Sequence, residues 1–203
     1  MQPSSLLRRC WNGRQCGLKI RCPQGRVGST PTRRMVQYEL GSMSDWPPGH
    51  APEGAAVFAH NELRMSVPPE RVWAWLVRAD RWNEYYGNAR WVRIVNGPGP
   101  GLAPGTTFKW VTFNAPITST VIEFEPYTRI GWDFRGLLGA RGYHRWLLEP
   151  SGDGCRVVTE ETQRGWVIRL VAPLMRSQLL KQHQRWLEAL ERVAAAGEPR
   201  PST

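Results

Sequence analysis

From Ala55 onward, the spacing of apolar residues predicts a strand followed by a helix. Residues 55–67 alternate between apolar and polar positions, as a strand with one buried face does. Residues 68–77 change to a helical spacing, with Pro69 in the first turn and Glu70 near the positive end of the helix dipole. The chain therefore passes from a half-buried strand into a helix that has one apolar face.

A second, short helix is expected from Asp80, as its N-cap, to Tyr85. The two helices carry several tryptophans, and the helical spacing indicates which of these side chains are buried and which are exposed. Trp73 lies on the apolar face of the first helix, so we interpret it and Trp82 as core residues. Trp75 lies off that face and is expected to be partly exposed. Charged residues interrupt this aromatic cluster, which disfavours a membrane-anchoring role for it.

Six further strand-like runs follow, separated by turn sequences such as "GPGPGLAPG", "PYT" and "PSGDG". They span residues 89–96, 106–114, 116–125, 129–135, 142–149 and 155–163. The last element is a long helix from about Pro173 to Ala196. Its apolar residues recur at three- to four-residue steps and are Leu174, Met175, Leu179, Trp186, Leu190 and Val193.

Successive strands joined by short loops form an antiparallel meander, and one face of such a sheet has to be covered. The long C-terminal helix is the element available to cover it. The pattern therefore predicts an α+β fold, in which a curved antiparallel meander sheet wraps around the C-terminal helix and two short helices follow the first strand.

The same pattern divides the chain into one domain and two flanking segments. We expect the domain at residues 55–196, a basic, disordered leader ending in a Pro/Gly linker at residues 1–54, and a disordered C-terminus at residues 197–203. Three origins of residues 1–42 stay open: an organelle transit peptide, an upstream in-frame start, or a vector-derived leader with natural translation beginning at Met43.

The net charge of +10 is concentrated in the leader. Residues 1–42 hold eight of the Lys and Arg residues against one Glu, and the remainder holds 19 Lys and Arg against 16 Asp and Glu. Because the rest of the chain is close to neutral, no nucleic-acid partner is expected. Apolar runs are too short to cross a membrane, so no stable membrane insertion is expected either.

The cysteines follow the same division. Cys10, Cys16 and Cys22 lie in the leader, in a spacing that is not usual for zinc, and Cys155 is the one cysteine that follows it. Without a disulfide framework the domain suits a reducing compartment, and we expect a cytoplasmic location. Cys155 follows a turn and is interpreted as a small core residue.

The segment "VPPERVWAWLVRADRWNEYYGNARWVRI" resembles the opening motif of the START-like helix-grip superfamily (SRPBCC), in particular its polyketide cyclase/dehydrase and lipid-transport branch. "GLAPGTTFKW", "VIEFEPYTRIGWDF" and "YHRWLLEPSGDGCRVV" resemble its strand–turn blocks, and "APLMRSQLLKQHQRWLEALERV" its closing helix. The resemblance covers roughly residues 55–196. It implies a cavity between sheet and helix that binds hydrophobic small molecules or lipids, in which some members cyclise or dehydrate polyketides.

Strand alternation identifies side chains that face this expected cavity. Large apolar groups share one face of each strand with a few polar ones, which is the usual composition of a small-molecule site. The expected ligand-contacting residues are Phe108, Trp110, Thr112, Asn114, Trp132, Phe134, Trp146, Thr159, Met175 and Leu179. We expect three of them, Trp110, Trp132 and Trp146, to line one cavity of at least roughly 300 Å³.

A histidine and a glutamate are the candidate catalytic residues. If the "PSGDG" turn pairs Leu148 with Val157, then His144 faces Glu161 on the neighbouring strand. Such a pair can hold the imidazole in one tautomer as an acid/base, or can be a structural pair without catalytic function. The sequence contains no metal-ligand spacing, phosphate loop or serine or cysteine nucleophile motif, so we expect neither a metal nor another cofactor.

Three functions remain as hypotheses, and the sequence does not establish whether the protein is an enzyme. The first is binding of a small hydrophobic ligand that is aromatic, polyketide-like or lipid. The second is a polyketide cyclase or dehydratase that uses His144 and Glu161 as acid/base, which requires these two residues to be in buried contact. The third is a protein-binding module resembling heat-shock ATPase activators, which requires an exposed apolar patch rather than a closed cavity. The identity of the ligand and the oligomeric state do not follow from the sequence.

Deleting residues 1–42 should leave the fold and the thermal midpoint nearly unchanged, because this segment lacks an apolar period that could dock on the core. Circular dichroism and thermal melting of the truncated and full chains test this expectation. A fall of more than a few degrees in the midpoint would show that the leader packs on the domain.

Overall fold

The computed structural model describes residues 46–200, and within them a single antiparallel sheet carries the domain. Its seven strands lie in the order β1-β7-β6-β5-β4-β3-β2. They are β1 (Val57–Met65), β2 (Arg90–Asn96), β3 (Thr107–Thr112), β4 (Ala115–Glu125), β5 (Arg129–Arg135), β6 (Arg141–Ser151) and β7 (Gly154–Arg164). The helices are α1 (Pro69–Leu76), α2 (Trp82–Tyr85), α3 (Trp166–Leu170) and α4 (Ala172–Ala196), with short 3₁₀ turns η1 (Ala79–Arg81) and η2 (Leu137–Gly139).

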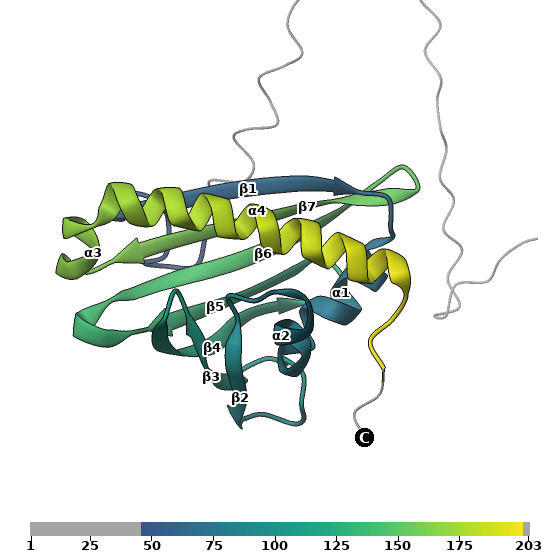
Figure 1. Ribbon diagram of the computed structural model, residues 1–203, viewed down its shortest axis with the longest axis horizontal. Helices are drawn as coiled ribbons and strands as arrows, with labels where there is room; N and C mark the ends of the chain where they lie inside the picture. The colour runs from purple at the N-terminus through teal and green to yellow at the C-terminus, as the bar shows by residue number, and fades with distance from the viewer. Residues whose placement is uncertain (1–45, 201–203) are drawn as a thin grey trace, which may run out of the picture. The chain divides into compact units, whose positions relative to one another are not determined.

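The long helix α4 runs across the concave face of the sheet, as Figure 1 shows. The buried residues of α4 form one face of the helix: Leu179, His183, Trp186, Leu187, Ala189, Leu190 and Ala194. The opposite face is exposed and polar. This arrangement confirms the predicted helix-grip α+β fold.

Trp186 is the centre of the packing between α4 and the rest of the domain. Its ring stacks on Tyr86 with centroids 4.3 Å apart and meets Trp82 and Trp146 edge-on at 5.0 Å each. Trp82 is itself fully buried and its indole N–H donates to the Leu76 carbonyl at 2.9 Å. The interpretation of the helix tryptophans is therefore confirmed for Trp82, and Trp73 is likewise buried.

The register of the strands agrees with the prediction made from the turn sequence. Leu148 pairs with Val157, and His144 pairs with Glu161. Because side chains alternate with a period of two, this register places both candidate catalytic residues on the face covered by α4. Cys155 is buried there and is a core residue, as expected.

Two local predictions were wrong, and one helix was not predicted. Asp80 does not cap a helix, because its carboxylate binds Arg78 at 2.7 Å and the residue lies inside η1. Leu174 belongs to the predicted apolar face of the C-terminal helix and yet is 64% exposed. Helix α3 was not expected; it is five residues long, too short to show a helical period.

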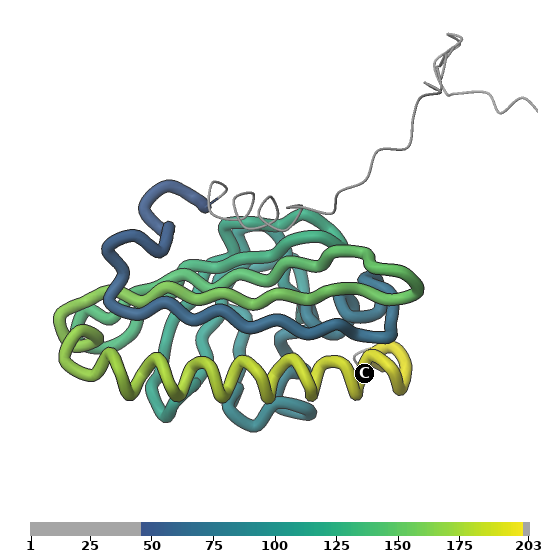
Figure 2. Tube along the Cα trace, turned by 90° about the horizontal axis from the view of Figure 1, so that it is seen from above, coloured from purple at the N-terminus to yellow at the C-terminus, as the bar shows by residue number. Residues whose placement is uncertain are grey.

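The segment expected to be a free Pro/Gly linker packs on the sheet. Figure 2 shows residues 46–56 on the side of the sheet opposite α4. Trp46 lies edge-on to Phe58 and Tyr143, and the Arg145 guanidinium lies 3.7 Å from the centre of its ring. The packed domain thus begins before Ala55, because Trp46 covers buried charged groups of the outer face. Residues 1–45 lie outside the described part of the chain.

The C-terminal boundary of the domain also differs from the predicted one at residue 196. The carbonyl of Gly197 accepts a hydrogen bond of 2.7 Å from the indole of Trp75, which is half-buried as predicted. The Arg200 carbonyl lies 3.4 Å from the Arg78 guanidinium, which donates to it. The domain therefore extends beyond residue 196, and residues 201–203 lie outside the description.

The position of Trp186 predicts how α4 responds to truncation. Trp186→Ala should lower the free energy of unfolding by about 3–5 kcal/mol, because it removes a buried ring that five other rings surround. Met175→Ala should cost less, because Met175 is half-buried beside a cavity. Urea denaturation of both variants measures this difference, and the reverse ranking would contradict it.

Candidate functional site

A partly open cavity of about 210 Å³ lies between the sheet and α4. Its apolar wall includes Trp110, Trp132 and Phe134 from the sheet and Met175 and Trp186 from α4. The space is smaller than the expected 300 Å³, and the reason lies in the core. The rings of Trp82 and Trp146 are fully buried and occupy the inner half of the space between sheet and helix, so the cavity is confined to the outer half.

Three titratable side chains meet at the inner wall of the cavity. His144 comes from β6, Glu161 from β7 and His183 from α4, and all three are buried. One carboxylate oxygen of Glu161 lies 3.4 Å from His144 Nδ1 and 3.2 Å from His183 Nε2. The two imidazole rings stack, with centroids 4.7 Å apart.

Further hydrogen bonds orient this cluster. The side-chain amide of Gln163 donates to the other oxygen of Glu161 at 2.6 Å. The hydroxyl of Thr159 lies 2.7 Å from His144 Nε2. If Nδ1–H of His144 donates to Glu161, Nε2 accepts from Thr159, which fixes one neutral tautomer.

Burial determines the charge state of His144. Desolvation, followed by the effect of His183, lowers the pKa of His144 well below its usual value. The imidazole is therefore neutral at pH 7, and its basic atom is Nε2, whose electron pair accepts the hydrogen bond from Thr159. Its neighbours are the indole rings of Trp132 and Trp146, which keep water away from it.

The same cluster is a set of potential metal ligands. One atom from each of His144, Glu161 and His183 lies within 4.8 Å of the others. Two imidazoles and a carboxylate suit a divalent transition metal. Spacing in the sequence did not indicate this set, because its members come from two strands and a helix. His183 hydrogen-bonds Glu161, His144 lies 3.4 Å from the same carboxylate oxygen, and the two imidazoles stack, so their arrangement is accounted for without an ion.

The structure places the predicted ligand-contacting residues in three environments. Five of them line the cavity: Trp110, Thr112, Trp132, Phe134 and Met175. Four others, Phe108, Trp146, Thr159 and Leu179, are fully buried in the surrounding core. The expectation that three tryptophans line one cavity is therefore wrong for Trp146, because it lies behind His144 and against Trp186.

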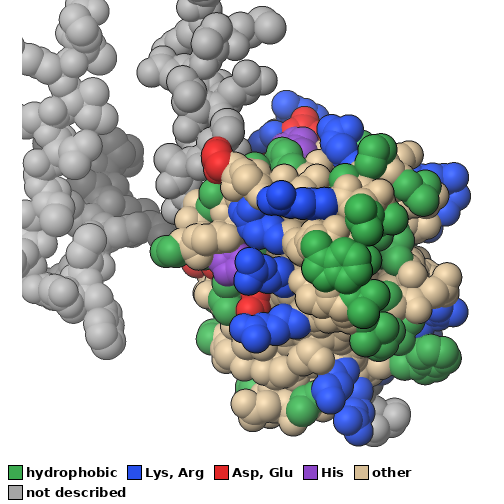
Figure 3. All heavy atoms as spheres, turned by 90° about the vertical axis from the view of Figure 1, so that its left-hand side faces the viewer, with side chains coloured by type: hydrophobic (Ala, Val, Ile, Leu, Met, Phe, Trp, Pro, Cys, Tyr) green, Lys and Arg blue, Asp and Glu red, His purple; other side chains and the backbone are tan. Residues whose placement is uncertain are grey.

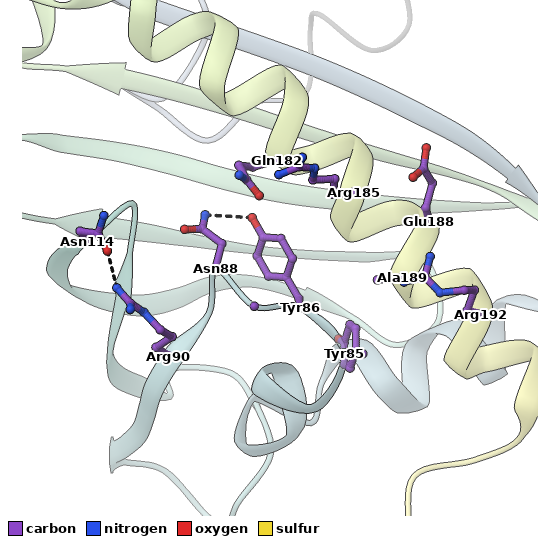
Figure 4. Close-up of a pocket in the computed structure, with 11 residues that line it drawn as sticks. Tyr85, Tyr86, Asn88, Arg90, Asn114, Gln182, Arg185, Glu188, Ala189 and Arg192 are labelled. Atoms are coloured by element: carbon purple, nitrogen blue, oxygen red, sulfur yellow. Dashed lines mark hydrogen bonds between the residues drawn. The ribbon is translucent and has the colours of Figure 1, made fainter.

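Asn114 lies outside the cavity, in a polar groove of about 490 Å³ between the β3–β4 turn and α4. Figure 4 shows this groove, in which Asn88 donates to the hydroxyl of Tyr86 and Arg90 donates to Asn114. Tyr86 lines both the groove and the cavity, so it separates the polar space from the apolar one.

Sequence reasoning missed two members of the site. His183 is not among the candidate residues from the sequence, because its position on the buried face of α4 follows from the helix phase relative to Trp186 and not from any motif. Gln163 shares the inward face of β7 with Glu161 by strand alternation, but its hydrogen bond to Glu161 joins two residues of one strand. The signal that could have identified His183 is a histidine three residues before a buried tryptophan of the same helix face.

Comparison with known proteins shows which family shares these features. Residues 61–195 match the model of the family described as polyketide cyclase/dehydrase and lipid transport. A search of curated proteins gives no match. A crystal structure of a hypothetical protein from Helicobacter pylori is similar at 26% identity and a TM-score of 0.68, covering 74% of this chain and 95% of that one.

Two more distant structures share the fold. An aromatase/cyclase from Streptomyces sp. R1128 is 11% identical with a TM-score of 0.57, covering 68% of this chain and 93% of that one. A truncated norcoclaurine synthase from Thalictrum flavum is 16% identical with a TM-score of 0.53, covering 67% of this chain and 91% of that one. Because the family model spans most of the described domain, the chain belongs to the polyketide cyclase/dehydrase and lipid-transport family, within the START-like helix-grip superfamily.

Proposed function

We propose that the protein binds a small hydrophobic ligand, aromatic, polyketide-like or lipid, in the cavity between the sheet and α4. The observation that carries this proposal is the composition of the cavity wall. Aliphatic side chains together with five indole and phenyl rings form most of it, and the polar cluster of Glu161 and His183 lies at its inner wall. A planar apolar ligand would gain ring contacts worth roughly 0.5–1.5 kcal/mol for each good aromatic pair.

Polar atoms without a partner favour a ligand that carries oxygen. The indole nitrogen of Trp132 and the Nδ1 atom of His183 are buried and have no hydrogen-bond partner in the described part of the chain. Both residues line the cavity. Buried polar groups are nearly always paired, so carbonyl or hydroxyl groups on a ligand would supply the missing partners. An aromatic or polyketide-like ligand fits this requirement better than a plain hydrocarbon chain.

The second candidate function is that of a polyketide cyclase or dehydratase, and the contact between His144 and Glu161 favours it. The hypothesis requires these residues to be buried together, and they lie 3.4 Å apart. His144 would accept a proton from the carbon between two carbonyl groups of the substrate. Glu161 would orient the imidazole and stabilise its charged form, and His183 binds the same carboxylate oxygen.

The third hypothesis, a protein-binding module, required an exposed apolar patch rather than a closed cavity. The described domain has both a cavity and exposed apolar side chains. A cavity with a buried polar cluster has no role in a module that recognises a partner only through its surface, so we rank this function below the other two. A cytoplasmic location also remains part of the proposal, and a described domain with one buried, free cysteine is compatible with a reducing compartment.

Ligand binding should appear as saturable quenching of tryptophan fluorescence by aromatic or polyketide-like compounds. Trp132→Leu should weaken this quenching, because Trp132 lines the cavity and is in van der Waals range of any occupant. Its far-UV circular dichroism should stay unchanged. The matched control is Trp91→Leu, which removes an exposed indole that does not line the cavity. Absence of saturable quenching by any compound tested would contradict the proposal.

Catalysis can be separated from binding with a variant of His144. His144→Gln keeps a polar side chain of similar reach but cannot act as a base at neutral pH. It should abolish turnover of a poly-β-carbonyl substrate, measured by product analysis, while quenching by an aromatic ligand persists. Turnover that survives the substitution would exclude the acid/base role of His144, and absence of turnover in the wild type would leave binding as the function.

A further inference from the structure

Five large apolar side chains are exposed together at the outer end of the cavity. We define this mouth patch as Leu137, Leu138, Trp166, Leu170 and Leu174, each 63–74% exposed. They come from η2, α3 and the first turn of α4. Figure 3 faces this end of the domain and shows hydrophobic side chains gathered in one area with Lys and Arg side chains beside them. Contiguous exposed apolar surface of this kind marks an interaction site.

The mouth patch is continuous with the cavity. Leu137 and Leu138 line the cavity and are also exposed, so the apolar wall extends to the surface without interruption. Gly165 holds α3 close to η2. It has a φ of +124°, and a Cβ at this position would come within 2.7 Å of the Gly139 carbonyl. The backbone is thus built to bring two apolar segments together at the cavity opening.

The charge around the mouth patch has one sign. Residues 134–148 and 162–187, which form the patch and its flanks, contain no Asp or Glu. Four exposed arginines lie on the patch elements or on the ends of β5 and β6 that flank η2: Arg135, Arg141, Arg169 and Arg176. An apolar centre beside arginines complements an anionic lipid interface, where apolar side chains enter the acyl boundary and cations contact the head groups. The indole of Trp166 is also suited to the boundary between the apolar and hydrated layers.

Other occupants fit this charge less well. A second copy of the chain would bring the same arginines against each other in a two-fold contact. Residues 1–42 contain eight basic residues and one acidic residue, so this segment would also be repelled. An acidic protein would satisfy the charge, but the opening of the cavity within the patch would then be closed off from any ligand.

We propose that the mouth patch docks on the surface of an anionic lipid bilayer and opens the cavity toward the lipid. The contact is peripheral, since no helix among the described residues is long and apolar enough to cross a membrane. A hydrophobic ligand could then pass between bilayer and cavity without crossing water. This proposal goes beyond ligand binding, because a cavity that takes its ligand from solution needs no such surface.

Cosedimentation of the full-length protein with vesicles tests the proposal. The wild type should bind vesicles of phosphatidylcholine mixed with phosphatidylglycerol, bind pure phosphatidylcholine weakly, and lose affinity as salt increases. Leu170→Gln/Leu174→Gln should weaken binding to the mixed vesicles about ten-fold or more, because it removes apolar groups without changing charge. Arg135→Gln/Arg169→Gln should weaken binding to the mixed vesicles and leave the weak binding to pure phosphatidylcholine unchanged.

The matched control is Trp91→Gln/Ile122→Gln, which removes two exposed apolar residues from β2 and β4 and should change binding less than about two-fold. The basic residues 1–42 are present in every variant, so their attraction to vesicles cancels in the comparison. Equal binding by wild type and Leu170→Gln/Leu174→Gln would overturn the proposal.

Light scattering and fluorescence complete the test. A wild-type dimer that Leu170→Gln/Leu174→Gln converts to a monomer would overturn the proposal in favour of a second copy. Failure to bind either kind of vesicle as a monomer would overturn it in favour of a protein partner. Quenching by an aromatic compound should persist in Leu170→Gln/Leu174→Gln, because both side chains lie outside the cavity wall; failure of docking and failure of cavity binding are therefore distinguishable.

Discussion

The contact between Trp186 of α4 and the rings around it is the interaction on which the rest of the domain depends. Without it the concave face of the sheet would have no cover, because α4 is the one long helix among residues 46–200. The ring touches five others, contributed by the sheet and by the segment that begins with α2: Trp82, Tyr86, Trp110, His144 and Trp146. One side chain thus fixes the position of the helix against three separate parts of the fold, and it also forms the inner wall of the cavity.

This packing explains both the size of the cavity and the burial of the polar cluster. Large rings fill the inner half of the space between sheet and helix, so the remaining volume lies toward α3 and the polar groups lie at its inner limit. His183 is three residues before Trp186 and is carried by the same helix face. Fixing the tryptophan therefore also fixes the imidazole beside Glu161. A carboxylate held by two imidazoles and an amide in such a place is well oriented, but it is accessible only to a ligand that has already entered the cavity.

The sequence predicts most of the fold because its signals are local. Alternation of apolar residues determines which face of each strand is inward, and the short "PSGDG" turn determines the pairing of His144 with Glu161. The site is predicted less completely, because a side chain lines the cavity or is packed behind it according to how deeply it lies between the sheet and α4. Trp110 and Trp146 have the same pattern along their strands, yet one lines the cavity and the other is packed behind it. Depth depends on the curvature of the sheet and on the phase of α4, and neither is encoded in the residues next to a given tryptophan. Trp46 was missed for the same reason, because its partners Tyr143 and Arg145 are distant in sequence.

Helix α3 carries apolar side chains both toward the core and toward the surface. This five-residue helix, "WVIRL", is apolar on nearly every side, although a helix on the surface of a soluble domain usually has one polar face. Val167 and Ile168 line the cavity and account for the inward side. Trp166 and Leu170 lie on the outward side and are largely exposed, which core packing does not require. Polar residues at these two positions would leave the cavity wall intact and would make the surface more soluble. Their apolar character therefore reflects a requirement outside the domain core, at the place where the cavity opens, and the arginines beside them indicate the charge of whatever meets that surface.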